Sequence, residues 1–401
     1  MTLLRERSIL LGVTGGIAAY KALELTRLLA MAGARVRVIM THSATEFVQP
    51  LSFQVLSGEP VRTNLFDLEA ESRVGHIELA TKADLAVIAP ATANIVGKLA
   101  HGIADDYLTT AMLVCQAPKI ICPAMNVNMF ENEAVQENLT ILRQRGYVQI
   151  GPDSGELACG AQGLGRLAPV EKIFEQIQEI LTPATLSGRR VLVTAGPTWE
   201  PLDPVRHLSN PSTGKMGYAL ARVARRRGAE VILVSGPTVL DPPAGVEVIN
   251  VRTSAEMYDR VMEKFPRVDA VVMAAAVSDY RPLEQAEHKL KKGKERIALE
   301  LEATADILLH LGELKKEQIL VGFAAETENL SENAREKMRK KNLDFIVAND
   351  LTAVGSGFGS DTNQVTIFWA NDRQESLPRE DKELVAQRIW DRVEEIWTQR
   401  M

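Results

Sequence analysis

The sequence has few cysteines, no long apolar run and no excess of positive charge, and each shortage disfavours a class of protein. Its three cysteines, Cys115, Cys122 and Cys159, form neither an even set nor a CxxC pair, which argues against a disulfide framework and a zinc site. No stretch approaches the roughly 18 uninterrupted apolar residues that a membrane-spanning helix requires. The formal net charge of -6 argues against a general nucleic-acid-binding protein, which needs positive charge to neutralise phosphates.

What is present is the composition of a folded protein, with 46% hydrophobic and 24% charged residues. A chain of 401 residues exceeds what one hydrophobic core usually serves, so we expect two domains. Near the N-terminus, the apolar run Ser8–Val13 is too short for the core of a signal peptide and lacks a cleavage site. We therefore expect a cytoplasmic protein with no membrane partner.

Apolar runs of strand length alternate with longer helical patterns in both halves, which predicts parallel sheets covered by helices. The predicted strands are residues 9–13, 36–40, 85–89 and 119–122, then 190–193, 231–234, 246–251, 270–274, 319–323, 345–348 and 364–368. Between the two sets, residues 181–188 are small and turn-forming. The sequence thus predicts two doubly wound α/β domains, residues 1–180 and 189–401, joined by a linker at 181–188.

A glycine turn, Thr14–Ile17, follows the first predicted strand and opens a helix, where backbone N–H groups could hold a phosphate. A plain tight turn is the alternative. A dinucleotide site usually has an acidic residue about 20 residues further on, at the end of the second strand. That position, Met40–Ser43, has none, and neither does Ser235–Pro237 in the second half. The pattern disfavours NAD and leaves a mononucleotide such as FMN.

Three polar residues in the first half are candidates for chemistry. His76 precedes the predicted strand 85–89, Asn126 lies in a polar turn after the strand 119–122, and Cys159 lies in a segment with four glycines that is typical of a loop over a site. An amide could bind a carboxylate, and an exposed thiol could exchange a proton. Taken singly, a histidine or a cysteine is more often structural.

Together these segments resemble the family of homo-oligomeric flavin-containing cysteine decarboxylases, over about residues 6–180. The shared features are the glycine turn, the His-Ile pair at 76–77, Pro-x-Met-Asn-x-x-Met at 123–129 and Gly-x-Leu-Ala-Cys-Gly at 155–160. The resemblance implies that His76 is the catalytic histidine, Asn126 the ligand of the substrate carboxylate and Cys159 the proton donor. It also implies contacts to FMN at Gly16, Ile17, Thr41 and Thr92.

This resemblance implies a redox-neutral decarboxylation. Loss of CO₂ from an unmodified cysteine carboxylate would leave a carbanion without an electron sink. In the family, the flavin oxidises the thiol to a thioaldehyde, which accepts those electrons, and then returns its hydride. No NAD is required.

In the second half, the glycine-containing segment Ser209–Gly217 fails the phosphate-binding P-loop pattern, because Met216 follows the Gly-Lys pair. Asn210 in this segment could contact a carboxylate or an acyl phosphate, and a structural cap is the alternative. Asp279 follows the predicted strand 270–274, at the usual ligand-binding edge of a sheet, although a turn-forming aspartate would have the same position.

Lysines gather at two places in the second half. Four lie between Lys289 and Lys294, which is dense enough to neutralise a triphosphate, although most such runs are solvated hairpins. Lys337 and Lys341 lie four residues apart and so share one face of a predicted helix. The pattern favours an anionic ligand near this edge of the second domain.

Residues 189–401 resemble the phosphopantothenate-cysteine ligase family in six motifs that occur in one order. These are Thr194–Thr198, Asn210 with Gly214–Gly217, Asp279–Pro282, Lys289–Lys292, Gly322–Thr327 and Ala348–Asp350. The resemblance implies that Asn210 holds an acyl-cytidylate and that Mg²⁺, with unknown protein ligands, screens the phosphates. It implies a CTP site made of Asp279, Lys289, Phe323, Lys337 and Lys341 and of the backbone at Asp306 and Ile307.

The two halves together resemble the bifunctional bacterial enzymes of coenzyme A biosynthesis. The implied reactions are ligation of cysteine to 4′-phosphopantothenate with CTP and decarboxylation of the product to 4′-phosphopantetheine. The implied fold is a flavodoxin-like or Rossmann-like flavoprotein domain followed by a Rossmann-like ligase domain. The implied assembly is a homo-oligomer, with trimeric contacts in the first domain and dimeric contacts in the second.

Other interpretations explain less of the sequence. A flavoprotein that acts on C-terminal cysteines of peptides, or one that transfers prenyl groups to flavin, would leave the second half unexplained. A regulatory flavin-binding protein would be expected to lack His76 or Cys159, and an NAD-dependent oxidoreductase is disfavoured by the missing ribose carboxylates.

Overall fold

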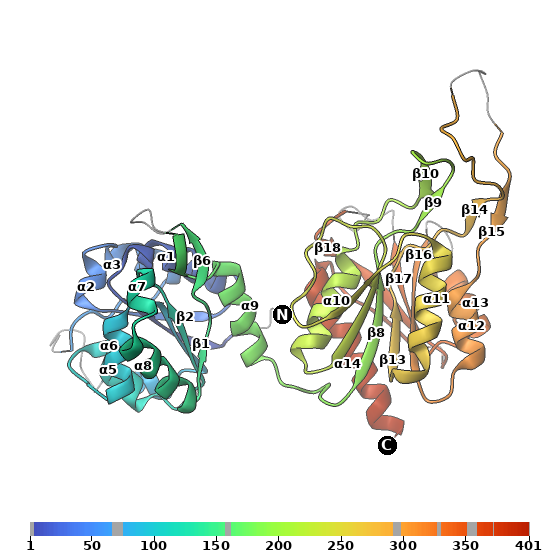
Figure 1. Cartoon of the computed structure of the whole chain (residues 1–401). Helices are drawn as coiled ribbons and strands as arrows, with labels where there is room; N and C mark the ends of the chain where they lie inside the picture. Colours follow the sequence, from blue (N-terminus) through green and yellow to red (C-terminus); the bar gives the residue numbers. More distant parts are fainter. Residues whose placement is uncertain are drawn as a thin grey trace. The chain divides into compact units, whose positions relative to one another are not determined.

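The computed structural model of the chain describes residues 4–65, 75–156, 162–291, 298–326, 330–350, 359–371 and 373–400. The chain divides into two compact units, Met1–Thr182 and Pro183–Met401, each described here by itself (Figure 1). The division falls within the segment 181–188 that the sequence predicts as a linker. No described helix has both the length and the apolar character needed to cross a membrane.

The first unit is built on a five-stranded parallel sheet. Its strands, in spatial order, are β2 (Arg35–Met40), β1 (Ser8–Val13), β3 (Leu85–Ala91), β4 (Lys119–Pro123) and β5 (Tyr147–Gln149). The order 2-1-3-4-5 is that of flavodoxin-like sheets, in which the chain reverses its direction of winding between β1 and β3. This confirms the predicted doubly wound α/β fold.

Alternate residues of β1 enter two separate hydrophobic cores, because successive side chains of a strand point to opposite faces. Leu11 packs with α1 (Lys21–Met31) and α9 (Val170–Leu181), whereas Leu10 packs with α5 (Ala93–His101) and α6 (Tyr107–Val114). The remaining elements are η1 (Ile17–Tyr20), α2 (His42–Thr45), α3 (Pro50–Ser57), α4 (Gly75–Thr81), α7 (Val127–Phe130), α8 (Glu133–Gln144) and the antiparallel pair β6 (Asp153–Glu156) and β7 (Gln162–Arg166).

The second unit contains an eight-stranded sheet. Its strands, in spatial order, are β12 (Glu247–Asn250), β11 (Glu230–Ser235), β8 (Arg190–Ala195), β13 (Ala270–Met273), β16 (Ile319–Glu326), β17 (Phe345–Asp350), β19 (Val365–Trp369) and β20 (Gln374–Ser376). The first six are parallel and follow the Rossmann order 3-2-1-4-5-6, and the last two are antiparallel additions. A Rossmann-like second domain is therefore confirmed.

Helices cover both faces of this sheet (Figure 1). On one face lie α10 (Lys215–Arg226) and α14 (Lys382–Arg400), where the indole nitrogen of Trp390 donates a hydrogen bond to Leu220 O at 2.9 Å. The other face is covered by α11 (Ser254–Lys264), η2 (Phe265–Arg267), α12 (Ile307–Leu314) and α13 (Leu330–Lys340).

Three short antiparallel pairs decorate the second unit. They are β9 (Trp199–Pro201) with β10 (His207–Ser209), β14 (Tyr280–Pro282) with β15 (Leu301–Ala303), and β18 (Thr362–Asn363) with β21 (Glu380–Asp381). The first two pairs contact each other and project from one end of the sheet (Figure 1). The third joins the segment after β17 to the start of α14.

Each strand predicted from the sequence has a counterpart whose ends lie within three residues of the predicted ones. Central parallel strands are buried on both faces and are therefore continuous apolar runs, which is why the pattern locates them. The antiparallel direction of β19 and the strand β20 were not predicted.

Candidate functional sites

In the first unit, predicted site residues follow four adjacent strands at the carboxyl edge of the sheet. Thr41 follows β2, Gly16 follows β1, Thr92 follows β3 and Asn126 follows β4. Ligands of open α/β sheets bind outside the carboxyl ends of the strands, at the point where the winding reverses. The sheet therefore gathers these four residues around the junction of β1 and β3.

The turns after β1 and β3 are joined by Thr14, whose side chain is buried. Its hydroxyl donates a hydrogen bond to Pro90 O at 2.8 Å and accepts one from Thr92 N at 3.1 Å. Thr92 in turn caps α5, because its hydroxyl accepts from Ile95 N at 3.4 Å. Thr14 belongs to the glycine turn found in the sequence, but its bridging role depends on contacts 76 and 78 residues away and was not predicted.

The turn after β2 lies against the glycine turn. Thr41 N donates to Val13 O at 3.0 Å, and a Cβ on Gly15 would come within 2.4 Å of the Cβ of Ser43. Only glycine permits this approach. At Gly16, an added Cβ would lie 3.6 Å from Thr92 Cγ2, so glycine leaves space beside Thr92. Ile17, the first residue of η1, is largely exposed.

Asn126 is held at the same edge by its neighbours. Its side-chain oxygen caps α7 by accepting from Asn128 N at 2.9 Å. Backbone bonds join Ala124 N to Ala91 O and Met125 N to Gly165 O, each at 3.0 Å, so the turn lies between β3 and β7. Asn126 thus lies between the β1–β3 junction and the β6–β7 pair.

The other two predicted residues of this unit are less completely placed. His76 lies in the first turn of α4, the helix that precedes β3, and its side chain is outside the described set. Cys159 lies outside the described residues, in the connection between β6 and β7.

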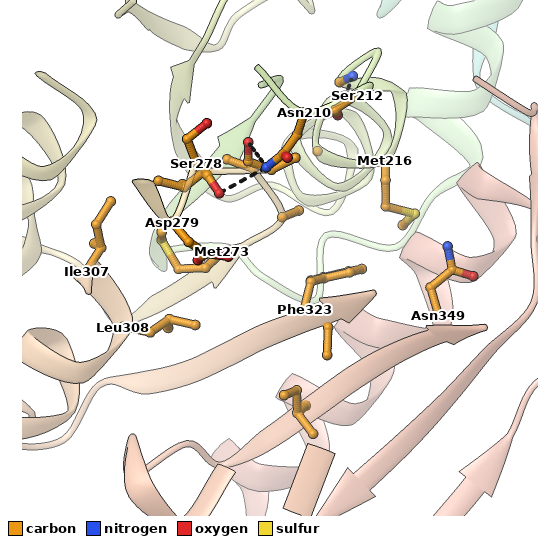
Figure 2. Close-up of a pocket in the computed structure, with 18 of the residues that line it drawn as sticks. Asn210, Ser212, Met216, Met273, Ser278, Asp279, Ile307, Leu308, Phe323 and Asn349 are labelled. Carbon is orange, nitrogen blue, oxygen red and sulfur yellow. Dashed lines mark hydrogen bonds between the residues drawn. The ribbon is translucent and has the colours of Figure 1, made fainter. Parts of the chain in front are cut away.

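The second unit has a pocket of about 550 Å³ at the carboxyl edge of its sheet (Figure 2). Seven predicted residues line it, namely Asn210, Asp279, Asp306, Ile307, Phe323, Lys337 and Lys341. Figure 2 shows Ile307 and Leu308 on one side, Met216 and Asn349 on the other, and Phe323 between them.

One wall of the pocket is the loop that leads into α10. Gly217, in the first turn of the helix, faces β8 so closely that an added Cβ would lie 2.5 Å from Ala195 Cβ. The side-chain nitrogen of Asn210 lies 3.3 Å from Ala276 O and 3.1 Å from Val277 O and donates to both carbonyls (Figure 2). Asn210 therefore joins this loop to the segment after β13.

The opposite wall is formed where α12 begins and α13 ends. Asp306 caps α12 by accepting from Leu309 N at 3.1 Å, and its other carboxylate oxygen is 2.8 Å from Lys341 Nζ. The ion pair is partly exposed, so its own contribution to stability is small. Its geometric effect is to direct the Lys341 ammonium toward the start of α12.

Lys289, which the structure does describe, does not line this pocket. It lies next to Leu290, whose N–H donates to Asp203 Oδ2 at 3.1 Å and whose carbonyl accepts from Arg206 Nη2 at 2.8 Å. The carboxylate of Asp203 has no exposed surface, and its hydrogen bonds from Arg206 hold the pKa of this group well below its usual range. A buried carboxylate thus fixes the backbone beside Lys289.

Further lining residues were not singled out by the sequence. Lys215 occurs in the Gly-Lys-Met-Gly motif, whereas Asn363 and Lys382 come from the β18–β21 region. The sequence around Asn363 and Lys382 contains none of the motifs named above, so it did not indicate that these residues belong to a site. Among the described residues, no group of three or more histidine, cysteine, aspartate and glutamate side chains could hold a metal ion.

The two units define a protein of the α/β nucleotide-binding class with a candidate ligand site on each sheet. One site lies at the junction of β1 and β3 in a flavodoxin-like sheet, and the other is a lysine-lined pocket on a Rossmann-like sheet.

Comparison with known proteins gives the family. Residues 2–182 match the family model "Flavoprotein", and residues 186–396 match "DNA/pantothenate metabolism flavoprotein C-terminal domain". The chain is 52% identical over 380 residues to the coenzyme A biosynthesis bifunctional protein CoaBC of Bacillus subtilis, covering 94% of each chain. It is 44% identical over 395 residues to the protein of the same name from Escherichia coli K12, covering 97% of each.

A solved structure of the C-terminal domain of a CoaBC protein is 44% identical, covers 54% of this chain and 99% of that chain, and has a TM-score of 0.47. On the sequence matches, the chain belongs to the family of bifunctional coenzyme A biosynthesis proteins. It is an enzyme that joins a decarboxylase and a ligase activity, as the sequence predicted.

Proposed function

We propose that the second unit ligates cysteine to 4′-phosphopantothenate with CTP, and that the first unit decarboxylates the product to 4′-phosphopantetheine with FMN. The observation that carries the proposal is the convergence of Asn210, Asp279, Phe323 and the start of α12 on one pocket of about 550 Å³. These residues come from separate motifs spread over more than 100 positions. A common nucleotide site explains why they meet.

In the ligase unit, we propose that CTP lies in this pocket and that Asn210 contacts the acyl-cytidylate. The amide of Asn210 already contacts the backbone after β13, which holds it at the centre of the pocket wall. Activation by CTP replaces an oxide with CMP as the leaving group, so that the nitrogen of cysteine can form the amide. We propose that Mg²⁺ accompanies the phosphates.

In the decarboxylase unit, the residues around the β1–β3 junction fit a flavin mononucleotide. Gly15 lets the turn that carries Thr41 pack against the glycine turn, and Gly16 leaves space beside Thr92. The flavin would supply the electron sink for loss of CO₂. Asn126 would bind the substrate carboxylate, Cys159 would deliver the proton and His76 would act as the catalytic histidine.

We further propose that the chain functions in the cytoplasm as a homo-oligomer, with contacts through both units. Exposed apolar side chains on neighbouring elements of the first unit support a contact surface there: Met31, Phe47, Leu51 and Val55 are each at least half exposed. Native mass spectrometry of the full chain would test this, and a monomer at micromolar concentration would contradict it.

The two reactions can be tested separately in one chain. With phosphopantothenate, cysteine, CTP and Mg²⁺, we expect pyrophosphate and CO₂, and a yellow protein that releases FMN on denaturation. The variant Asn210→Ala should lose pyrophosphate formation but still decarboxylate added phosphopantothenoylcysteine. The variant Asn126→Ala should show the reverse. Pyrophosphate release without cysteine-dependent CO₂, despite bound FMN, would refute the two-step scheme.

A further inference from the structure

Two lysines that the proposed scheme does not use line the ligase pocket. Lys215 is the first residue of α10 and Lys382 is the first residue of α14, and both lie in the lining together with Gly359 and Asn363. Lys215 precedes Met216, which Figure 2 shows on the side of the pocket away from Ile307. Both lysines contact the segment 359–361, so they lie together on the wall where α10 and α14 begin.

The contacts of the two ammonium groups differ. Lys215 Nζ lies 2.6 Å from Asp361 Oδ1 and 3.2 Å from Gly359 O. Lys382 Nζ donates to the backbone carbonyl of Ser360 at 2.5 Å, and within the described part of the chain no carboxylate lies within 4 Å of it. Asp361 pairs with Lys215 and acts on Lys382 only from a longer distance, so the two ammonium groups leave a net positive charge on this wall.

The backbone fixes Lys382 in this position. Thr362 pairs with Asp381 in the β18–β21 ladder, and Lys382 N donates to Asp361 O at 3.0 Å. The start of α14 is therefore tied to the pocket wall by bonds that do not involve the Lys382 side chain. Replacing the side chain should leave the wall in place.

Electrostatics make this wall receptive to an anion. Burial lowers the pKa of Lys382, the nearby Lys215 ammonium lowers it further, and Asp361 opposes the shift. Asp361 is 84% exposed, so its attraction for Lys215 is largely screened. An anion between the two amines would relieve their repulsion and gain two charge-assisted contacts.

The Rossmann-like topology indicates which part of a nucleotide would lie here. In sheets of order 3-2-1-4-5-6, phosphates lie at the turn between the first strand and the first helix, where the helix N-terminus attracts negative charge. In this unit those elements are β8 and α10, and α10 begins at Lys215. The opposite wall, at the start of α12, is then left for the nucleoside.

We propose that Lys382, together with Lys215, binds the β- and γ-phosphates of CTP and stabilises the pyrophosphate that leaves when the acyl-cytidylate forms. This inference rests on the proposed ligase function. The carboxylate oxygen of phosphopantothenate attacks the α-phosphorus of CTP, and a new O–P bond forms there. The bond from the α-phosphorus to the bridging oxygen breaks, and its electron pair leaves with pyrophosphate. The two ammonium groups neutralise this added negative charge.

Nucleotide binding to the full chain provides the test, with CTP compared with CMP by calorimetry in the presence of Mg²⁺. The variant Lys382→Gln should weaken CTP binding by about tenfold or more, because a contact between charged groups is lost, and should change CMP binding by less than about twofold. Lys382→Arg should recover part of the affinity for CTP. The matched control Lys316→Gln removes an exposed lysine that does not line the pocket and should bind both nucleotides like the wild type.

A rate measurement separates this role from a structural one. Lys382→Gln should slow pyrophosphate release in the absence of cysteine, while decarboxylation of added phosphopantothenoylcysteine stays unchanged. Equal losses of CTP and CMP affinity, or no loss of either, would overturn the inference. A wild-type chain that decarboxylates but binds neither nucleotide would instead overturn the ligase function itself.

Discussion

Gly217 permits the close packing of α10 against β8 that forms one wall of the ligase pocket. In Gly217→Ala, the new Cβ would lie 2.5 Å from Ala195 Cβ, 2.7 Å from Thr194 O and 2.9 Å from Ala195 Cα. Reaching ordinary van der Waals contact requires the helix to move by about 1 Å. Three overlaps at once, two of them with backbone atoms, should cost about 3 kcal/mol, of which the better helix propensity of alanine offsets about 1.

The expected net loss is therefore about 2 kcal/mol in the free energy of unfolding of the second unit. For a unit of this size, that lowers its Tm by about 4–8 °C. Scanning calorimetry of the full chain would follow the second unit's transition, and pyrophosphate release should fall because the first turn of α10 is displaced. The first unit should melt and decarboxylate as in the wild type.

A matched substitution in the first unit should have the opposite sign. Gly97 lies inside α5, and a Cβ there would have its nearest neighbour, Asn138 Nδ2, at 3.7 Å. Gly97→Ala should therefore stabilise the first unit by up to about 1 kcal/mol. If Gly217→Ala melts like the wild type and still releases pyrophosphate at the wild-type rate, the packing argument is wrong.

Two further predictions concern buried polar groups. Thr14→Val should destabilise the first unit by about 1–3 kcal/mol and weaken FMN binding, because Pro90 O and Thr92 N lose their shared partner. Fluorescence titration with FMN would measure the loss of affinity. The control Thr26→Val removes only a hydrogen bond within α1 and should retain FMN affinity. Asp203→Asn should raise the KM for CTP without changing decarboxylation, because one carboxylate oxygen accepts from Val205 N and Arg206 N and the other from the Arg206 side chain and Leu290 N, whereas an amide has only one acceptor oxygen. An unchanged KM would argue against a role for the segment around Lys289 in nucleotide binding.

The sequence predicted the fold well where structure depends on local pattern. Central strands such as β3 and β13 are apolar throughout, so their positions followed directly from the sequence. The strand β5 was missed because it has only three residues, none of them fully buried, at the edge of the sheet. Two-stranded pairs such as β18–β21 were missed for a similar reason.

The candidate sites were predictable to the extent that their residues follow strands. Thr92 comes directly after β3 and Asn126 comes three residues after β4, and adjacency of the strands brings them together. Lys382 could not be found in this way, because a pairing between residues 362 and 381 places it in the pocket. The lysine-rich composition likewise reveals the positive charge around Lys289 but not how the backbone there is held. That backbone is fixed by the hydrogen bond from the adjacent Leu290 N to Asp203, which lies 87 residues away in the sequence.

The position of α14 has a consequence for the order in which the enzyme is made. The first unit takes all of its strands and helices from residues 1–182, so it can fold and acquire its flavin while the ribosome is still translating the second. The second unit lacks the lysine that completes the pocket wall until translation has passed residue 382, and the helix that buries Trp390 against α10 until translation has passed residue 400. During synthesis, flavin binding therefore becomes available well before nucleotide binding.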